Sequence, residues 1–312
     1  MNLNENKEEN NSAKISIGMP IRNAGNGLEE RLKSILSQSY ENFELIISDN
    51  DSNDLTSEIC KKFTNLDKRI RYHKQSENIG LYNNWRFVFE KAKNDYFVWA
   101  SDDDIWHYDF LKENLDVLLT NKDYVCSISK IVWVGPSIED LKINSQDSFI
   151  KKIEKKVRSY LGLLYPVTTN GDFKKRLRKC LKKKGSVYIY GLFRTEVLRK
   201  VIPKESFLGV ETAITLGALK YGNFFVLESE LFQKAVGKKG ASSGGMIRWI
   251  KIISPNNYSI IFPVHYLNLW LIKNLGIRLY LRNIDAIISM FLVQYVYLFF
   301  DVYQILKKRI IP

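Results

Sequence analysis

The chain has 312 residues and a formal net charge of +13, with 45% hydrophobic and 13% aromatic residues. This composition excludes a broadly disordered chain and allows one large domain or two smaller ones with a substantial core. Three widely spaced cysteines without a CxxC pair argue against a disulfide framework or a zinc site and indicate a reducing compartment. Residues 1–13 are polar, rich in Asn and Glu, and are expected to form a disordered leader without a signal peptide.

Short apolar runs alternate with helical patterns from residue 14 onward. The runs at 14–20, 43–51, 69–73 and 96–100 have the composition of strands. Between them, apolar residues recur at helical spacing in the segments 27–40, 55–63 and 81–92. This order predicts an α/β fold of Rossmann-like type, with a mostly parallel sheet and helices on both faces.

Acidic residues gather where two of these strands end. Asp49, Asp51 and Asp54 follow the second strand, and Asp102–Asp104 follow the fourth. Ligands of such sheets bind beyond the carboxyl ends of the strands, so both clusters are candidates for a binding site. Three adjacent carboxylates repel one another, and either solvent or a bound cation must offset that repulsion.

The middle of the chain is strongly basic. Residues 151–184 contain thirteen Lys or Arg against two acidic residues, and 172–184 predicts a basic helix. A solvated helix face, attraction to anionic lipid headgroups and attraction to a phosphorylated substrate all fit this charge. The sequence contains no nucleic-acid-binding motif, so nucleic acid is not expected as a partner.

The C-terminal part differs in composition from the rest. After a flexible junction at 237–245, residues 246–312 are rich in Ile, Leu, Tyr, Phe and Trp and predict helices. Residues 286–300 carry no charge, but Asp301 interrupts the run, and a membrane span needs about twenty apolar residues. Because basic residues flank both ends, we expect an aromatic-rich helix in the membrane interface. The alternative is a buried helix of a C-terminal subdomain.

Several segments, taken in order, resemble one enzyme family. They are ISIGMPIRNAGNGLEERLKSILSQSYENFELIISDNDSND, ENIGLYNNW, WASDDDIWHYDFL, YGLFRTEVLRK and FLGVETAITLGALKYGNFFVLESELF. The sequence resembles family 2 glycosyltransferases with a GT-A fold, of the type that builds bacterial cell-surface polysaccharides. The resemblance covers about residues 14–232.

The resemblance implies a role for the three adjacent aspartates. In this family a DxD motif holds a divalent cation, Mn²⁺ or Mg²⁺, that bridges to the diphosphate of a nucleotide-sugar. By position, Asp103 and Asp104 are the implied metal ligands, and Asp102 is the implied contact to the ribose or to the waters of the metal. Ser101 stands where the family usually has a further Asp.

The resemblance also implies the nucleotide-binding and catalytic residues. Asp49 matches the residue that bonds the nucleotide base, although Asx-rich turn chemistry alone also explains its segment. Glu211 matches the catalytic base, and Lys234 lies where relatives have a phosphate-facing residue. The remaining implied contacts to the nucleotide-sugar are Pro20, Arg22, Asn78, Gly80 and Asn84.

These expectations define a domain plan and a function. The plan is a GT-A domain at 14–236, with a nucleotide-sugar-binding half at 14–125 and an acceptor half at 126–236, followed by a membrane-associated helical region at 246–312. The implied function is an inverting transfer of a sugar to a glycan or a polyprenyl-diphosphate-linked acceptor, in the cytoplasm at the inner face of the cell membrane. A sugar nucleotidyltransferase, or a non-catalytic module that binds anionic lipid or nucleic acid, is the alternative.

Overall fold

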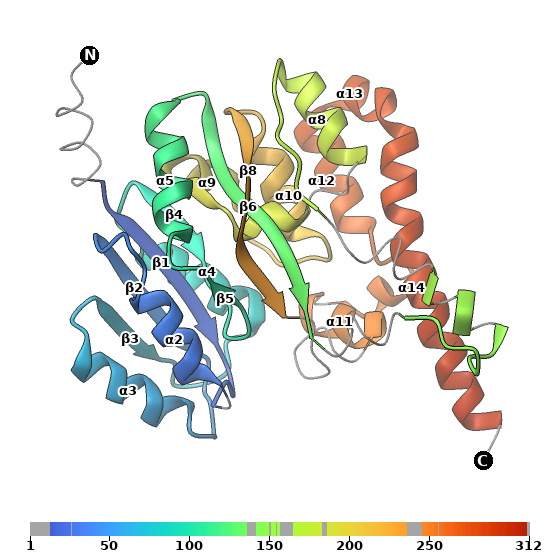
Figure 1. Ribbon diagram of the computed structural model, residues 1–312. Helices are drawn as coiled ribbons and strands as arrows, with labels where there is room; N and C mark the ends of the chain where they lie inside the picture. The colour runs from blue at the N-terminus through green and yellow to red at the C-terminus, as the bar shows by residue number, and fades with distance from the viewer. Residues whose placement is uncertain are drawn as a thin grey trace.

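A computed structural model describes residues 13–25, 27–135, 142–149, 151–153, 155–156, 165–182, 186–235, 245–254 and 256–310 (Figure 1). Within these residues the chain forms one eight-stranded sheet with the order β3-β2-β1-β4-β7-β6-β8-β5. Helices cover the sheet, and a group of C-terminal helices lies at one side of it (Figure 1). The expected leader, apart from Ala13, and the expected junction, apart from Gly245, lie outside the described residues.

The N-terminal half of the sheet is parallel. β1 (Ile15–Ile21) pairs with β2 (Phe43–Asp49) and with β4 (Tyr96–Trp99), and β2 pairs with β3 (Ile70–Lys74). β1, β2 and β4 are buried along almost their whole length, which is why they appear as continuous apolar runs rather than alternating patterns. The helices between the strands are α2 (Leu28–Leu36), α3 (Thr56–Leu66) and α4 (Leu81–Lys91). The predicted alternation of strands and helices is confirmed.

The C-terminal half of the sheet is mixed. β7 (Leu192–Arg194) runs antiparallel to both β4 and β6 (Tyr124–Val134), and β8 (Asn223–Ala235) runs parallel to β6. β5 (Ile105–Trp106) closes the edge by pairing antiparallel with β8. The expected mostly parallel sheet is therefore parallel in its first half and mixed in its second. The helices of this half are α5 (Phe110–Thr120), η1 (Ser186–Tyr190), α9 (Thr195–Val201) and α10 (Val210–Ala218).

The predicted basic helix forms α8 (Phe173–Lys182). Leu177, Cys180 and Leu181 of this helix are buried on one side. Arg178 joins this helix to the C-terminal helices, because its guanidinium donates to both carboxylate oxygens of Asp285 at 2.5 and 2.6 Å.

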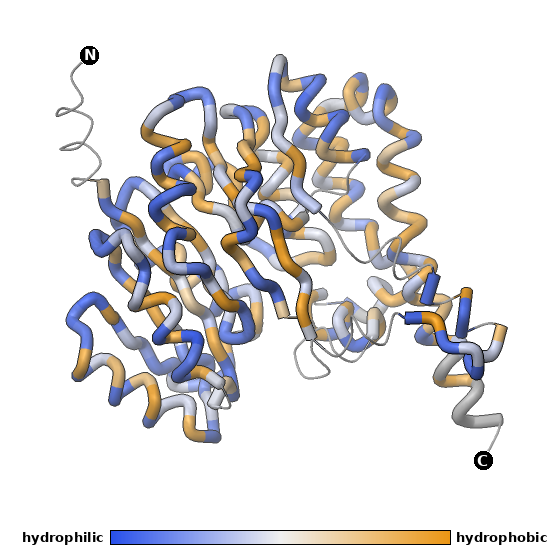
Figure 2. The backbone as a smooth tube through the Cα atoms, in the orientation of Figure 1, coloured by the Kyte–Doolittle hydropathy of each residue, from blue (hydrophilic) through white to orange (hydrophobic). Residues whose placement is uncertain are grey.

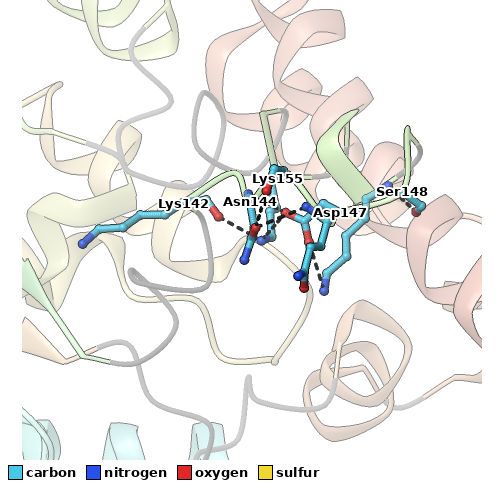
Figure 3. A network of polar contacts seen from close by, with 8 residues as sticks. Lys142, Asn144, Asp147, Ser148 and Lys155 are labelled. Atoms are coloured by element: carbon cyan, nitrogen blue, oxygen red, sulfur yellow. Dashed lines mark hydrogen bonds and ion pairs between the residues drawn. The ribbon is translucent and has the colours of Figure 1, made fainter.

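Part of the basic insertion carries its own counter-ion (Figure 3). The carboxylate of Asp147 lies 2.6 Å from the Lys155 ammonium and 3.3 Å from that of Lys151. The hydrogen bond from Lys155 and the amide of Asn144 hold the pKa of Asp147 at about 2. The single negative charge of Asp147 thus offsets one of the two positive charges of these lysines, and among the described residues α8 carries six further Lys or Arg side chains.

The C-terminal region is helical, as predicted. It contains α11 (Gly245–Ile253), η2 (Asn257–Ile260), α12 (His265–Leu275), α13 (Ile277–Arg282) and α14 (Ile284–Ile310). Hydrophobic residues recur along α12 and α14 (Figure 2). The stretch Ile284–Tyr303 of α14 is long and apolar enough to cross a bilayer, by length and composition, and 28% of its most apolar window is buried. α14 packs against α8 and α11.

Candidate active site

A cavity of about 280 Å³ lies where β1 and β4 end. Its wall is built by β1, α4, the loop after β4, η1, α10, the end of β8 and α11. This is the carboxyl edge of the parallel strands, where ligands of α/β sheets bind. The residues that line the cavity are Pro20, Leu81, Tyr82, Trp85, Trp99, Ala100, Ser101, Asp102, Asp103, Tyr190, Ser206, Val210, Glu211, Lys234, Ala235, Trp249 and Ile253.

Five residues singled out from the sequence meet in this cavity. They are Pro20 from β1, Asp102 and Asp103 from the loop after β4, Glu211 from α10 and Lys234 from β8. Glu211 and Lys234 are more than a hundred residues from the acidic loop in sequence, and the sheet brings them together. The cavity therefore combines the carboxylates of Asp102, Asp103 and Glu211 with the ammonium of Lys234.

Asp102 and Asp103 form the acidic edge of the cavity. The hydroxyl of Ser101 donates a hydrogen bond to Oδ1 of Asp103, which fixes the orientation of that carboxylate. Burial raises the pKa of Asp102 to about 6, and the negative charge of Asp103 adds to this effect. Two like charges held side by side at the wall of a cavity favour a bound cation.

Asp104 behaves differently from its two neighbours. It is 3% exposed, and the Lys234 ammonium lies 3.3 and 3.2 Å from its two oxygens. The backbone N–H of Ala235 also points to Oδ1 at 3.4 Å. Asp104 does not line the cavity, and the metal-ligand role predicted for it does not fit this pairing. The three carboxylates are adjacent in the sequence, but in the folded chain Asp104 pairs with Lys234.

Lys234 is held as an ammonium. Burial acts to lower the pKa of Lys234, but the oxygens of Tyr190, Asp104 and Asp103 outweigh burial and raise it well above its ordinary value. Its Nζ atom also lies 3.9 Å from the centroid of the Tyr190 ring, within cation–π distance. Lys234 is thus a fixed positive charge at the border of the cavity.

Glu211 lies in the first turn of α10 and is half-buried in the wall of the cavity. Gly209 precedes the helix with φ 89°, and a Cβ atom there would lie 2.6 Å from Leu267 of α12. A glycine is therefore needed both for the left-handed backbone and for the close packing that sets the start of α10. Burial raises the pKa of Glu211, and Lys234 opposes this effect. A carboxylate with a raised pKa is a stronger base at neutral pH.

Asp49 lies below the surface rather than in the cavity. It is fully buried, and its carboxylate accepts hydrogen bonds from the Ser52 amide and from the Ser57 and Tyr72 hydroxyls at 2.8–2.9 Å. Burial acts to raise the pKa of Asp49, but these hydrogen bonds outweigh it and lower the pKa. The turn chemistry considered for this segment is present, and the predicted contact with the nucleotide base remains a prediction.

Two of the other predicted nucleotide contacts form a structural network. Oδ1 of Asn78 accepts from the side chain of Asn50 at 2.8 Å, and from the amide of Gly80 at 3.0 Å. Asn84 is buried on α4, accepts from the Ser48 hydroxyl at 2.6 Å and donates to the Ser48 carbonyl at 3.0 Å. These side chains tie the ends of β2 and α4 together and do not line the cavity.

Arg22 and Gly80 lie at the rim of the same sheet edge. Arg22 is exposed immediately after β1 and does not line the cavity. Gly80 precedes α4 with φ 84° and ψ 158°, a backbone conformation that residues with a side chain rarely adopt. The fold therefore explains this glycine by the turn into α4.

Aromatic residues without a role predicted from the sequence also line the cavity. The rings of Trp85 and Trp99 stack with centroids 3.8 Å apart and an interplanar angle of 1°, and the Trp99 indole N–H donates to the Trp85 carbonyl at 3.2 Å. Tyr82 stacks beside Trp85, and Trp249 enters from α11. Trp85 and Trp99 belong to the motifs that carry the family resemblance, so the sequence contained a signal that could have assigned them to the site. Trp249 had no such signal, because it comes from a helix of the C-terminal region.

The acidic edge fits a divalent cation that arrives with a diphosphate. Among the described residues, no three His, Cys, Asp or Glu side chains converge to form a metal shell by themselves. Mg²⁺ and similar ions are commonly bound through one or two carboxylates together with substrate phosphates and waters. Asp102 and Asp103 supply that number of ligands, and both line the cavity.

The family model described as Glycosyl transferase family 2 matches residues 16–200, which is more than half of the chain. The chain belongs to glycosyltransferase family 2. Both the family and the GT-A fold predicted from the resemblance are confirmed. The matched segment runs from within β1 to within α9 and therefore contains the acidic loop, whereas Glu211, Lys234 and α11 lie beyond it.

Curated relatives of this family 2 glycosyltransferase match parts of the chain. An uncharacterized glycosyltransferase of Rickettsia typhi is 29% identical over 52% of this chain and 48% of its own length. One from Haemophilus influenzae is 36% identical over 34% of this chain and 43% of its own length. A Bacillus subtilis protein named for teichuronic acid biosynthesis, TuaG, is 30% identical over 34% and 42%. The chain thus spans less than half the length of these relatives.

Two solved structures are similar to this family 2 glycosyltransferase in fold. A mannosyltransferase from Pyrobaculum calidifontis, in complex with GDP-Man and Mn²⁺, has a TM-score of 0.58 and 14% identity over 97% of this chain and 77% of its own. Residues 1–349 of Staphylococcus aureus TarS, in complex with UDP-GlcNAc, have a TM-score of 0.56 and 12% identity over 90% and 81%. At this identity the similarity shows the shared GT-A architecture.

Proposed function

We propose that this glycosyltransferase catalyses a metal-dependent, inverting transfer of a sugar from a nucleotide-sugar to a hydroxyl group of a glycan or lipid-linked acceptor. The observation that carries the proposal is the placement of Glu211 in the same cavity as Asp102 and Asp103. Solved structures of similar fold hold GDP-Man or UDP-GlcNAc, which supports a nucleotide-sugar as the donor. The family match favours this reaction over a sugar nucleotidyltransferase and over a non-catalytic lipid- or nucleic-acid-binding module.

Asp102 and Asp103 would hold the divalent cation, Mn²⁺ or Mg²⁺. When bound, such an ion neutralises the charge that develops on the diphosphate as the sugar leaves. The carboxylate of Asp103, oriented by Ser101, is the proposed direct ligand. Asp102 beside it would hold the waters of the ion or the ribose. Lys234 adds a positive charge on the same side of the cavity, which favours the anionic leaving group.

Glu211 is the proposed general base. Its carboxylate would take the proton from the acceptor hydroxyl as that oxygen attacks the anomeric carbon from the face opposite the diphosphate. General bases of this kind contribute roughly 10²–10⁴-fold in rate. Burial raises the pKa of Glu211, which brings this pKa closer to neutral pH.

The donor and acceptor would occupy different parts of the chain. We assign residues 14–125 to the donor, with its nucleotide over the ends of β1 and β2, near Pro20, Arg22, Asp49, Asn78, Gly80 and Asn84. Residues 126–236 supply Lys234 beside the diphosphate of the donor and Glu211 on the acceptor side. α11 adds Trp249 to that side, so the helical region at 246–312 belongs to the site as well.

Turnover of nucleotide-sugars tests the reaction. The full chain is incubated with Mn²⁺ and a panel of UDP-, GDP- and dTDP-sugars, and release of the nucleotide is measured. Glu211→Gln and Asp103→Asn are each expected to lower the rate by about 10²-fold or more. Glu228→Gln is the matched control, because Glu228 is an exposed residue of β8 that does not line the cavity. Equal rates in Glu211→Gln and Glu228→Gln would remove the proposed base.

We further propose that the enzyme works at the inner face of the cell membrane as a peripheral protein. Among the exposed apolar side chains of α14, six recur at spacings of three and four residues, which places them on one face: Ile288, Leu292, Tyr295, Phe299, Val302 and Leu306. α8 packs against the same helix and exposes Lys174, Lys175, Lys179 and Lys182. An apolar helix face with lysines beside it complements an anionic lipid surface.

Flotation with vesicles tests this placement. The full chain is expected to float with vesicles that contain phosphatidylglycerol and to float poorly with phosphatidylcholine alone. Leu292→Ser combined with Phe299→Ser should abolish flotation, whereas Leu66→Ser should not, since Leu66 is an equally exposed residue of α3. Unchanged flotation of the α14 variant would contradict the assignment of this face to lipid.

A further inference from the structure

Asp301 interrupts the longest apolar stretch of the chain, and its carboxylate points to another helix. The backbone N–H of Ile247, in the first turn of α11, donates to Oδ2 of Asp301 at 3.0 Å. Gly245 has φ 84°, and a Cβ atom at this position would clash with both oxygens of Asp301. The carboxylate of Asp301 therefore lies in contact with the first turn of α11.

This contact supplies what α11 lacks. The first N–H groups of a helix have no partner inside the helix, and a negative charge near them is stabilising. α11 has no acidic residue in its own first turn. Asp301, fifty-four residues later in the sequence, provides both the acceptor and the charge.

The other end of α11 is fixed to the catalytic domain. The hydroxyl of Ser206, which itself lines the cavity, donates to the carbonyl of Ile253 at 2.6 Å. Between these two hydrogen bonds, the side chain of Ile250 is buried. Trp249 and Ile253 line the cavity. A hydrogen bond at each end therefore adds to the packing of α11 against α14 and α4 in fixing the position of this wall.

The wall formed by α11 is the apolar side of the cavity. Trp249 and Ile253 join Leu81 and Val210, and Glu211 and Asp103 lie in the same cavity. During sugar transfer, water competes with the acceptor hydroxyl for the anomeric carbon. An apolar wall that stays in place keeps water out of the site.

We propose that Asp301 is a positioning residue for the transfer reaction: by capping α11 from the tail helix α14, it holds Trp249 and Ile253 in place as a wall that excludes water. The inference rests on the proposed function, since it takes the cavity as the site of transfer. The proposal also gives α14 a second role besides membrane contact, which is to position α11. α14 thus connects the apolar face on its outer side to the wall of the cavity through its packing against α11 and through the Asp301 carboxylate.

The test compares Asp301→Ala, Asp301→Asn and a matched control in the full chain. The control is Asp285→Ala, which removes an ion pair of the same helix with Arg178 and contacts neither α11 nor the cavity. Hydrogen exchange of the amides at 247–253 is measured first. Exchange should be about tenfold faster in Asp301→Ala, near wild type in Asp301→Asn, which keeps an acceptor oxygen, and unchanged in Asp285→Ala.

The second measurement is hydrolysis, without acceptor, of the nucleotide-sugar that the wild type cleaves fastest in the UDP-, GDP- and dTDP-sugar panel. Asp301→Ala should raise kcat for transfer to water by about threefold or more, with KM for the donor within about twofold. Asp301→Asn should restore the wild-type kcat. A general loss of structure would lower kcat instead of raising it.

Three results overturn the proposal in distinguishable ways. Unchanged exchange at 247–253 in Asp301→Ala would show that the carboxylate does not hold α11. Faster exchange with an unchanged or lowered kcat, or equal effects in Asp285→Ala, would show that α11 does not control water at the site. A wild-type chain that cleaves none of the nucleotide-sugars would refute the proposed function, and the role at the site with it.

Discussion

The ammonium of Lys234 lies 3.2 and 3.3 Å from the two oxygens of Asp104 and 3.9 Å from the centroid of the Tyr190 ring. Both charged side chains are largely withdrawn from water, with 15% and 2% of their side-chain surface exposed. A buried ion pair of this kind depends on both partners, because either charge alone would be left uncompensated. The pair joins the loop after β4 to the end of β8, and so it fixes the loop that carries the acidic edge.

The first prediction concerns the stability of this pair. Asp104→Leu should lower the free energy of unfolding by about 3–5 kcal/mol, because Lys234 would remain buried without its paired carboxylate. The double variant Asp104→Leu with Lys234→Met should recover most of the loss, since it removes both charges. Urea unfolding followed by circular dichroism measures both values. A double variant as unstable as the single one would show that the pair is not an isolated unit.

The second prediction concerns the pH dependence of the reaction. A general base acts as the carboxylate, and burial raises the pKa of Glu211 above its ordinary 4.5. As the pH falls through this raised pKa, Glu211 becomes protonated and kcat falls, so the acid limb of the profile should lie above pH 4.5. Glu211→Gln should lose this limb together with about 10²–10⁴-fold of the rate. A wild-type acid limb that survives in Glu211→Gln would assign the titration to another group.

The third prediction separates two roles for Asn84. The side-chain amide of Asn84 hydrogen-bonds the hydroxyl and the carbonyl of Ser48 at the end of β2. Asn84→Ala should therefore lower the free energy of unfolding by about 1–3 kcal/mol, because it leaves buried partners unpaired. KM for the donor should stay within about threefold of wild type. Unchanged stability with a large rise in KM would instead support the direct contact implied by the family resemblance.

The first half of the fold could be predicted from the sequence because its signals are local. β1, β2 and β4 are buried on both faces and appear as unbroken apolar runs, and α2 buries Leu28, Leu32 and Ile35 at helical spacing. β5 and β7 contain two and three residues, which is too short for any periodic pattern. The mixed character of the sheet depends on these strands, so it could not be predicted from the sequence.

The candidate site divides in the same way. The chain order of the motifs placed Asp102, Asp103 and Glu211, and the structure gathers all three in one cavity. The partner of Asp104 is 130 residues away, and the sequence around Lys234 contains no signal for a buried pair. Trp249 enters the cavity from α11, which is bonded to Asp301 and Ser206, and such contacts between distant segments follow from tertiary packing alone.

The proposed reaction depends most on the acidic edge as the place where a cation and a diphosphate meet. Calorimetric titration with the nucleotide-sugar that the wild type turns over, with and without Mn²⁺, tests this directly. Binding by the wild type should be at least about tenfold tighter with Mn²⁺, and Asp103→Asn should lose that gain. Asp123→Asn, a change at an exposed residue before β6, should keep the gain. Equal Mn²⁺-dependent binding by the wild type and Asp103→Asn would contradict the account.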